Sequence, residues 1–132
     1  MPTITGTSGS NTLVGTDGDD VIDGLGGGDT INGGGGADHI IGGSGDDTLT
    51  GGAGADTFAY VDRRFGDDTI TDFSAGDRID LSALNIASIE DLRPFIRQDG
   101  PDAVIDLRFA GNSEAIRITN VSAQSLSNAN FV

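Results

Sequence analysis

Apolar residues recur at every ninth position through the first half of the chain. Residues 6–59 divide without a gap into six nonapeptides, and the eighth position of each is apolar: Leu13, Ile22, Ile31, Ile40, Leu49 and Phe58. The fourth position is always glycine. The sixth position is asparagine in the first repeat and aspartate in the other five: Asn11, Asp20, Asp29, Asp38, Asp47 and Asp56. A fixed period of this kind is typical of a fold in which each repeat stacks on its neighbours.

Each nonapeptide combines two backbone conformations, a turn and a short strand. Its first six residues are rich in glycine, which adopts positive φ angles without steric cost and so favours tight turns. Its last three residues predict a short strand whose middle side chain points inward, because side chains alternate between the two faces of a strand. Two repeats then complete one coil. We therefore predict an all-β protein, a right-handed parallel β-roll of nonapeptide repeats with a thin apolar core.

The column of acidic residues predicts the ion that holds the turns together. Coils of a parallel roll lie about 4.7 to 4.9 Å apart, which is twice the calcium–oxygen distance of about 2.3 to 2.6 Å. An ion between two turns therefore reaches carboxylates of both, and backbone carbonyls of the glycine-rich turns complete its shell. The predicted sites for several calcium ions comprise Asn11, Asp20, Asp29, Asp38, Asp47 and Asp56 with Gly18, Gly27, Gly36, Gly45 and Gly54.

The repeat continues in degenerate form after residue 59. Asp68 and Asp77 are nine residues apart, as are Ile70 and Ile79, so RRFGDDTIT and DFSAGDRID (63–80) are two further repeats, displaced by the three residues 60–62. We expect one more coil here, with Asp68, Asp72 and Asp77 as additional calcium ligands. Asp80 is either a further ligand or a solvated charge at the end of a strand. The predicted calcium-binding roll thus covers residues 1–82.

Residues 83–132 are predicted to form a C-terminal cap. The segment 88–97 begins with Ser88, carries acidic residues in its first turn and favours a short helix that Pro94 bends or ends. The alternating segments 104–110 and 115–119 predict an antiparallel hairpin. The apolar chain end, with Leu126, Phe131 and Val132, is expected to dock on the hairpin or the last coil. Such a cap covers strand edges that the last coil leaves unpaired.

Composition limits the chemistry of the chain. Its 132 residues carry a formal net charge of −14, with 21 acidic residues against 7 basic ones, which are all arginine and all follow residue 62. The lack of a basic patch excludes nucleic acid as a partner, and no apolar stretch reaches the roughly 18 residues of a membrane span. Without Lys or Cys, Schiff-base chemistry, disulfides and thiolate metal sites are also excluded.

Enzyme activity is not expected. His39 is the only histidine and is predicted to lie on the outer surface, whereas an HExxH metalloprotease site needs two histidines. Repeated carboxylates favour calcium over a glycosidase pair, which needs one acid in an apolar setting. A disordered linker would suit the composition, but a linker does not keep an apolar residue every nine positions. Thr12, Thr30, Thr48 and Thr57 are also expected to point outward, in an array that Val21 and His39 interrupt.

The repeats resemble the GGxGxDxUx nonapeptide of RTX (repeats-in-toxin) proteins. The match is fullest in GGSGDDTLT (42–50) and GGAGADTFA (51–59). It continues through DDTITDFSAGDRIDLS (67–82), which is similar to the closing segment of serralysin-type proteases and of the R-modules of mannuronan C5-epimerases. The resemblance is looser from residue 83 onward. The first repeat departs from the motif, with Asn11 for Asp and Thr7-Ser8 for the second and third positions.

The resemblance implies a non-catalytic module of a secreted bacterial protein. Such a module folds on extracellular calcium after type I export, and it carries the export signal at its C-terminus, so the type I secretion apparatus is an implied partner. The resemblance to epimerase R-modules leaves an alternative function open. In that alternative the chain is a calcium-dependent module that binds an extracellular, alginate-like polysaccharide.

Overall fold

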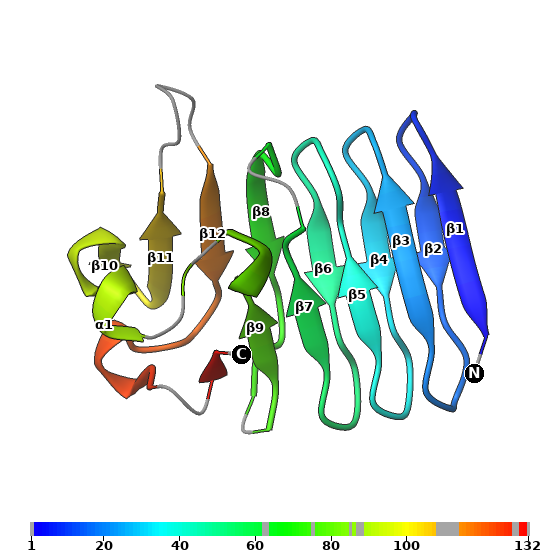
Figure 1. The fold of residues 1–132 in the computed structure, drawn as a ribbon. Coiled ribbons are helices and arrows are strands. Elements are labelled where there is room, and N and C mark those ends of the chain that lie inside the picture. Colours follow the sequence, from blue (N-terminus) through cyan, green and yellow to red (C-terminus); the bar gives the residue numbers. More distant parts are fainter. Residues whose placement is uncertain are drawn as a thin grey trace.

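The strands alternate between two sheets that face each other. In the computed structural model, residues 2–61, 64–74, 76–84, 86, 89–107, 114–127 and 130–131 are described. One sheet is parallel and has the order β1 (Thr3–Thr7), β3 (Val21–Leu25), β5 (His39–Ile41), β7 (Thr57–Ala59) and β9 (Arg78–Asp80). The other begins with β2 (Thr12–Val14), β4 (Thr30–Asn32), β6 (Thr48–Thr50) and β8 (Asp67–Ile70). Each coil thus contributes one strand to each sheet, which confirms the parallel β-roll (Figure 1).

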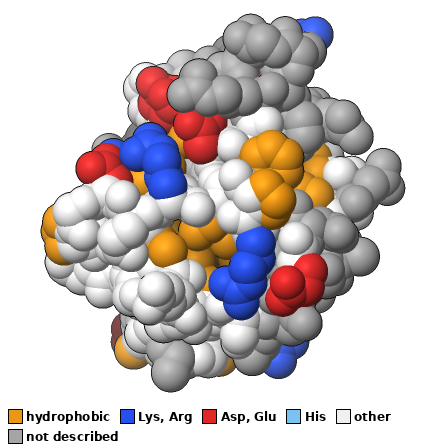
Figure 2. Space-filling view, turned by 90° about the vertical axis from the view of Figure 1, so that its left-hand side faces the viewer, with side chains coloured by type: hydrophobic (Ala, Val, Ile, Leu, Met, Phe, Trp, Pro, Cys, Tyr) orange, Lys and Arg blue, Asp and Glu red, His pale blue; other side chains and the backbone are white. Residues whose placement is uncertain are grey.

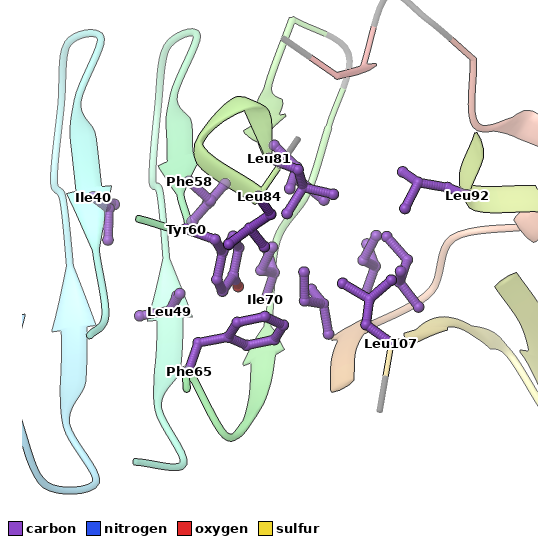
Figure 3. Packing of buried hydrophobic residues seen from close by; sticks show 14 of the residues in the cluster. Ile40, Leu49, Phe58, Tyr60, Phe65, Ile70, Leu81, Leu84, Leu92 and Leu107 are labelled. Carbon is purple, nitrogen blue, oxygen red and sulfur yellow. The ribbon is translucent and has the colours of Figure 1, made fainter. Parts of the chain in front are cut away.

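The inward residues form the predicted column. Ile22 pairs with Ile40, and Ile31 pairs with Leu49, each 18 residues further along the chain. After β7 the spacing becomes 21, because Leu49 faces Ile70. This wider spacing confirms the insertion of three residues in the turn that precedes β8. The side chains of the column are at most 1% exposed from the second repeat onward: Ile22, Ile31, Ile40, Leu49, Phe58, Ile70 and Ile79 (Figure 3).

The two outer faces carry different rows of residues. Thr12, Thr30, Thr48 and Thr69 occupy adjacent strands of the seven-stranded sheet in register. Val21 and His39 lie in register on the five-stranded sheet, and Thr57 follows them there. Val21 and His39 therefore interrupt the expected threonine array only on the five-stranded sheet, since consecutive repeats point to opposite sides of the roll.

The cap extends one sheet beyond the roll. β12 (Ala115–Ile118) pairs in parallel with β8, and β11 (Asp102–Asp106) and β10 (Ile96–Asp99) add antiparallel strands. The pairing of β11 with β12 confirms the hairpin, whose connection at 108–113 lies outside the described residues. On the other sheet Phe131 forms a bridge with Ile79, and Leu126 is buried. Both sheet edges of the last coil are therefore covered, as expected; Val132 lies outside the described residues.

The predicted helix 88–97 is shorter than expected. Helix α1 spans Ile89–Leu92, the 3-10 helix η2 spans Arg93–Phe95, and the chain then enters β10. Pro94 cannot continue an α-helix because it lacks a backbone donor. Ile96 then pairs with Ile105 of β11, so the sheet takes over the end of the segment. Two further 3-10 helices span Ser82–Leu84 and Ala123–Ser125, and no helix in the described ranges is long and apolar enough to cross a membrane.

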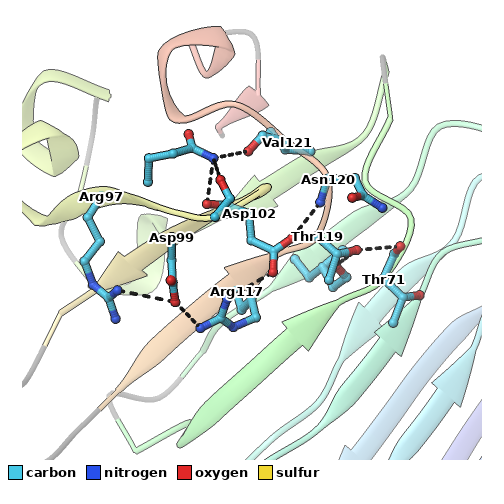
Figure 4. A network of polar contacts seen from close by, with 11 residues as sticks. Thr71, Arg97, Asp99, Asp102, Arg117, Thr119, Asn120 and Val121 are labelled. Atoms are coloured by element: carbon cyan, nitrogen blue, oxygen red, sulfur yellow. Dashed lines mark hydrogen bonds and ion pairs between the residues drawn. The ribbon is translucent and has the colours of Figure 1, made fainter.

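Polar contacts fasten the cap strands to one another. Arg117 of β12 donates to Asp99 of β10 at 2.7 Å and to Asp102 of β11 at 3.0 Å (Figure 4). The Gln98 side-chain amide donates to backbone carbonyls of the β10–β11 connection, and its oxygen accepts the N–H of Ala123 at 2.7 Å. Seen from the capped end, basic side chains lie beside acidic ones (Figure 2). The cap strands thus carry ion pairs on their surface in addition to their buried apolar residues, unlike the acidic repeats.

Candidate metal centre

Two columns of buried position-6 side chains run along the turns of the roll. One comprises Asn11, Asp29, Asp47 and Asp68 and is called here the Asn11 stack; the other comprises Asp20, Asp38, Asp56 and Asp77 and is called the Asp20 stack. The seven aspartates are at most 2% exposed. Every position-6 residue predicted from the sequence as a ligand thus lies in one of two straight ladders.

One carboxylate oxygen of each rung is occupied by the backbone. Oδ1 of Asp38 accepts the N–H of Asp20 at 2.9 Å, and Oδ1 of Asp56 accepts the N–H of Asp38 at 3.0 Å. The same bond links Asn11 to Asp29, Asp29 to Asp47, Asp47 to Asp68 and Asp56 to Asp77 at 2.7 to 3.0 Å. These bonds fix the orientation of each carboxylate, so its second oxygen has a defined position.

The second oxygen is left without a partner along the middle of both ladders. Oδ2 is buried and accepts no hydrogen bond in Asp29, Asp38, Asp47, Asp56 and Asp68. A buried polar atom without a partner costs about 1 to 3 kcal/mol, and more when it is charged. Four of these oxygens, on Asp29, Asp38, Asp47 and Asp56, therefore require a ligand that the protein chain itself does not supply at a hydrogen-bonding distance, whereas that of Asp68 lies beside the hydroxyl of Tyr60.

Backbone carbonyls converge on the same oxygens. A Cβ added to Gly24 would collide with Oδ2 of Asp29 and lie 2.6 Å from the carbonyl oxygen of Gly42, in the next turn of the stack. Gly33 stands in the same relation to Asp38 and Gly51. Only glycine leaves room for oxygens from two successive turns. Sequence reasoning missed these first-position glycines, although the position is glycine in all six repeats.

The fourth-position glycines shape the turns. Gly27, Gly36, Gly45 and Gly54 adopt φ angles of 84°, 85°, 102° and 108°, which L-residues with a side chain rarely adopt. Gly18 is not among the positive-φ residues. The turns of the inner repeats thus share one conformation, and the second repeat differs from it.

The end rungs are closed by hydroxyl residues instead. Oδ1 of Asn11 accepts the N–H of Thr7 at 2.7 Å and its hydroxyl at 3.1 Å. Oδ2 of Asp20 accepts the N–H and hydroxyl of Thr16 at 2.6 and 3.1 Å. At the other end, Oδ2 of Asp77 accepts the N–H and hydroxyl of Ser74 at 2.9 and 3.2 Å. The Thr at position 2 of the first two repeats was the sequence signal for this difference.

Asp72 and Asp80 lie beside the ladders. The two oxygens of Asp72 accept the N–H groups of Gly51 and Gly52 at 2.9 and 2.8 Å. Oδ1 of Asp80 accepts the N–H and hydroxyl of Ser82 at 3.0 and 2.6 Å. Asp72 therefore links two coils with both of its oxygens, and Asp80 closes a local turn with one, in contrast to the inner rungs.

The donor set fits calcium. All candidate ligands are oxygens, which hard cations such as Ca²⁺ prefer, and calcium takes about 6 to 8 of them. Within the described residues no three His, Cys, Asp or Glu side chains form a cluster of their own. An ion would therefore combine carboxylates with backbone carbonyls of its own stack, such as that of Gly42 in the Asn11 stack or that of Gly51 in the Asp20 stack.

Without a metal the ladder favours protons. Burial, together with neighbouring carboxylates, raises the pKa of Asp47 to about 7, that of Asp56 to about 6 and that of Asp68 to about 9. The backbone N–H that each carboxylate accepts lowers its pKa, but by less than burial raises it. An unfolded aspartate has a pKa of about 3.9. Between these values the folded state binds more protons than the unfolded state, so metal-free stability falls as pH rises.

We therefore predict that acid partly replaces calcium. In chelator, the content of β structure by circular dichroism should be higher at pH 5 than at pH 9, because protonation removes the buried charges. The triple variant Asp47→Asn, Asp56→Asn, Asp68→Asn should show a much weaker pH dependence under the same conditions. A wild-type spectrum in chelator that does not change between these pH values would contradict the prediction.

The comparisons with known proteins agree with the geometry. The model of the RTX calcium-binding nonapeptide repeat (4 copies) matches residues 5–40 and 32–59. The AlgE6R3 and AlgE6R2 subunits of the Azotobacter vinelandii mannuronan C5-epimerase are 32% and 31% identical to the chain. Their solution structures match with TM-scores of 0.75 and 0.79 over 96% and 98% of this chain and 80% and 91% of those chains.

A more distant match shows the fold alone. The crystal structure of the extracellular lipase LipA from Serratia marcescens is 23% identical and has a TM-score of 0.75, over 98% of this chain and 20% of that one. No curated protein sequence matches significantly. With its nonapeptides, its ladders of buried aspartates and its likeness to two R-module structures, the chain belongs to the family of RTX calcium-binding nonapeptide-repeat proteins.

Proposed function

We propose that the chain is a non-catalytic calcium-binding module that takes up several ions along its two ladders. The observation that carries the proposal is the row of buried Oδ2 atoms without a partner, which includes those of Asp29, Asp38, Asp47 and Asp56. Backbone carbonyls of the glycine-rich turns, among them Gly18, Gly27, Gly36, Gly45 and Gly54, complete the shells. Residues 1–82 form the binding roll, and residues 83–132 form its cap.

Titration calorimetry tests this function directly. Chelator-treated protein should bind several Ca²⁺ per chain with midpoints of about 10⁻⁴ to 10⁻³ M, the range of extracellular calcium modules. Mg²⁺ should bind far more weakly, because it requires a smaller and more regular octahedral shell. A protein that takes up no calcium at millimolar concentration refutes the proposal.

We further propose that the module acts outside the cell after type I export, with its signal in the C-terminal segment. The resemblance of the repeats to those of RTX proteins supports this proposal. The low expected calcium affinity gives a physical reason for folding outside the cell. A chain that needs about 10⁻⁴ to 10⁻³ M calcium stays unfolded in the cytosol and folds outside.

Deletion of residues 121–132 should separate the roles of the cap and the signal. The deletion removes buried Leu126, the bridge from Phe131 to Ile79 and the bond from Ala123 to Gln98. It should raise the calcium concentration needed for folding, because it exposes the edge of β9 and apolar core. It should also abolish export through a type I system. Unchanged folding contradicts the cap, and retained export places the signal elsewhere.

A second candidate function is binding of an anionic, alginate-like polysaccharide. On the seven-stranded sheet, the row of Thr12, Thr30, Thr48 and Thr69 runs in register into Arg117 of β12. Arg117 pairs through Val104 with Arg97 of β10. A hollow of about 200 Å³ lies at this junction, lined by Thr69, Arg97, Val104, Ala115 and Arg117 and also by the acidic residues Asp67, Asp68 and Asp106. Hydroxyls in register next to guanidinium groups suit a chain of sugar acids.

The test uses a matched pair of arginines. Arg97 is half exposed, and its ion pair with Asp99 is long, at 3.6 Å, so Arg97→Gln should leave the fold intact. The variant should bind an oligouronate in calcium about tenfold more weakly than the wild type, which corresponds to ~1.4 kcal/mol. Arg78 lies on the other sheet, in register with Thr57. Arg78→Gln should bind like the wild type. Equal effects of the two variants, or no binding by the wild type, would contradict this second function.

A further inference from the structure

The last turn of the Asn11 stack differs from those before it. Ile40 pairs with Phe58, so Tyr60 stands where the preceding turn has Gly42. A Cβ on Gly42 would lie 2.5 Å from Oδ2 of Asp47. Tyr60 carries a whole side chain at this place. The spacing between paired residues also increases from 18 to 21 between β6 and β8. The last turn of the stack therefore differs from the earlier turns in both length and sequence.

The Tyr60 side chain lies inside the roll. It is 3% exposed, and its ring meets that of Phe65 edge-on, with centroids 4.7 Å apart (Figure 3). Its hydroxyl makes no hydrogen bond of normal geometry, although Asp68 lies within the range of a side-chain hydrogen bond to it. The carboxylate of Asp68 is the acidic group that acts on this hydroxyl most strongly, followed by Asp47. A buried donor without an acceptor thus lies beside a buried acceptor without a donor.

The other three ends of the ladders show how such a rung is closed. Thr7, Thr16 and Ser74 each direct a hydroxyl to the position-6 residue of their own turn, namely Asn11, Asp20 and Asp77. The inner rungs Asp29, Asp38, Asp47 and Asp56 receive no such hydroxyl on Oδ2, although Ser44 stands at the third position of the Asp47 repeat. A hydroxyl residue at the end turn is therefore the shared feature of closed rungs.

We propose that Tyr60 closes the fourth end, so that its hydroxyl takes the place of calcium as the partner of Asp68. The phenol O–H donates to Oδ2 of Asp68 after a small adjustment of the two side chains, which satisfies both groups at once. The calcium-binding parts of the ladders then consist of Asp29, Asp38, Asp47 and Asp56. A hydroxyl residue lies at each of the four ends of the two ladders. The inference rests on the proposed calcium binding by the inner rungs.

Calcium titration calorimetry on two matched variants tests this inference. Asp29 and Asp68 belong to the same stack, and each accepts one backbone N–H with Oδ1. Asp29→Asn should lower the number of bound ions by at least one or raise the midpoint about tenfold, since it removes a ligand. Asp68→Asn should keep the number of ions and shift the midpoint less than about twofold, since the amide NH2 that replaces Oδ2 donates to the phenol oxygen and no calcium ligand is lost.

A spectroscopic readout separates this role from mere packing. The chain has one Tyr, six Phe and no Trp, so absorption on the long-wavelength side of the phenylalanine bands reports on Tyr60 alone. In calcium, the phenol absorption of the wild type should be shifted to longer wavelength relative to Asp68→Asn, because a carboxylate is the stronger acceptor. Tyr60→Phe should raise the calcium midpoint of the wild type but change that of Asp68→Asn much less.

The outcomes distinguish this inference from the proposed function. If Asp68→Asn loses as much calcium as Asp29→Asn and the phenol spectrum is the same in the wild type and Asp68→Asn, Tyr60 does not close the ladder, and calcium binding itself stands. If the wild type binds no calcium, the proposed function fails and this inference fails with it. Loss confined to Asp29→Asn, together with the spectral shift, supports both.

Discussion

Removal of calcium should convert the folded chain into a largely disordered one. The first 59 residues hold nine carboxylates and no basic residue, and both ladders bury their carboxylates. Calcium that binds only the folded state stabilises it by about 2.7 kcal/mol per site at a hundredfold excess over Kd. With several sites, the ion decides whether the chain folds. Circular dichroism in chelator, and then in 10⁻² M calcium (about ten times the upper end of the expected range), measures this change.

Ionic strength and magnesium are the controls for the folding transition. Sodium chloride at matched ionic strength screens exposed charges but leaves the buried Oδ2 atoms of Asp29, Asp38, Asp47 and Asp56 without a ligand. Neither salt nor magnesium should therefore restore more than a minor part of the β signal. A chain that keeps the same spectrum in chelator and in calcium would contradict the dependence on the ion.

Replacement of a middle rung should weaken calcium-induced folding far more than replacement of an end rung. Asp38 lies between Asp20 and Asp56 in its stack, and its Oδ2 is buried without a partner. Asp38→Ala should raise the calcium midpoint about tenfold or more, since each ~1.4 kcal/mol of lost binding energy is a factor of ten. The midpoint is read from the circular dichroism signal during a calcium titration.

Asn11→Ala is the matched comparison at the end of the other stack. The Oδ1 atom of Asn11 already accepts two hydrogen bonds from Thr7, and the side chain carries no charge. Its loss should shift the midpoint less than about threefold. Asp38→Asn should fall between the two, because it keeps the bond to the Asp20 amide but not the charge. Equal shifts for Asp38→Ala and Asn11→Ala would refute the stacked ladder.

In the cap, the sequence patterns did not predict which segments pair with one another. Residues Ile96–Asp99 follow a segment with helix signals, yet they form a strand because β11 offers an unpaired edge. The hairpin of β11 and β12 was predicted from its alternation, but its parallel attachment to β8 was not. Attachment depends on an edge that only the finished last coil presents, so no local pattern encodes it.

The candidate metal site was likewise predictable from the sequence in part. The register of Asp20, Asp29, Asp38, Asp47 and Asp56 was readable from the sequence, because a period of nine fixes which side chains share a column. Which oxygens stay open was not readable. Oδ1 is occupied by an amide 18 to 21 residues earlier in the chain, and that pairing exists only when the coils have stacked.

The sequence by itself determined the period, the inward apolar column and the ladder of acids, since these follow from the order of residues and from the alternation of side chains along a strand. The tertiary structure decided the rest. It separated Thr12, Thr30 and Thr48 from Val21 and His39, since consecutive repeats lie in opposite sheets. It also placed Tyr60 beside Asp68 in the buried end of a stack. Both results depend on contacts between coils, whose geometry arises only when the turns pack against one another.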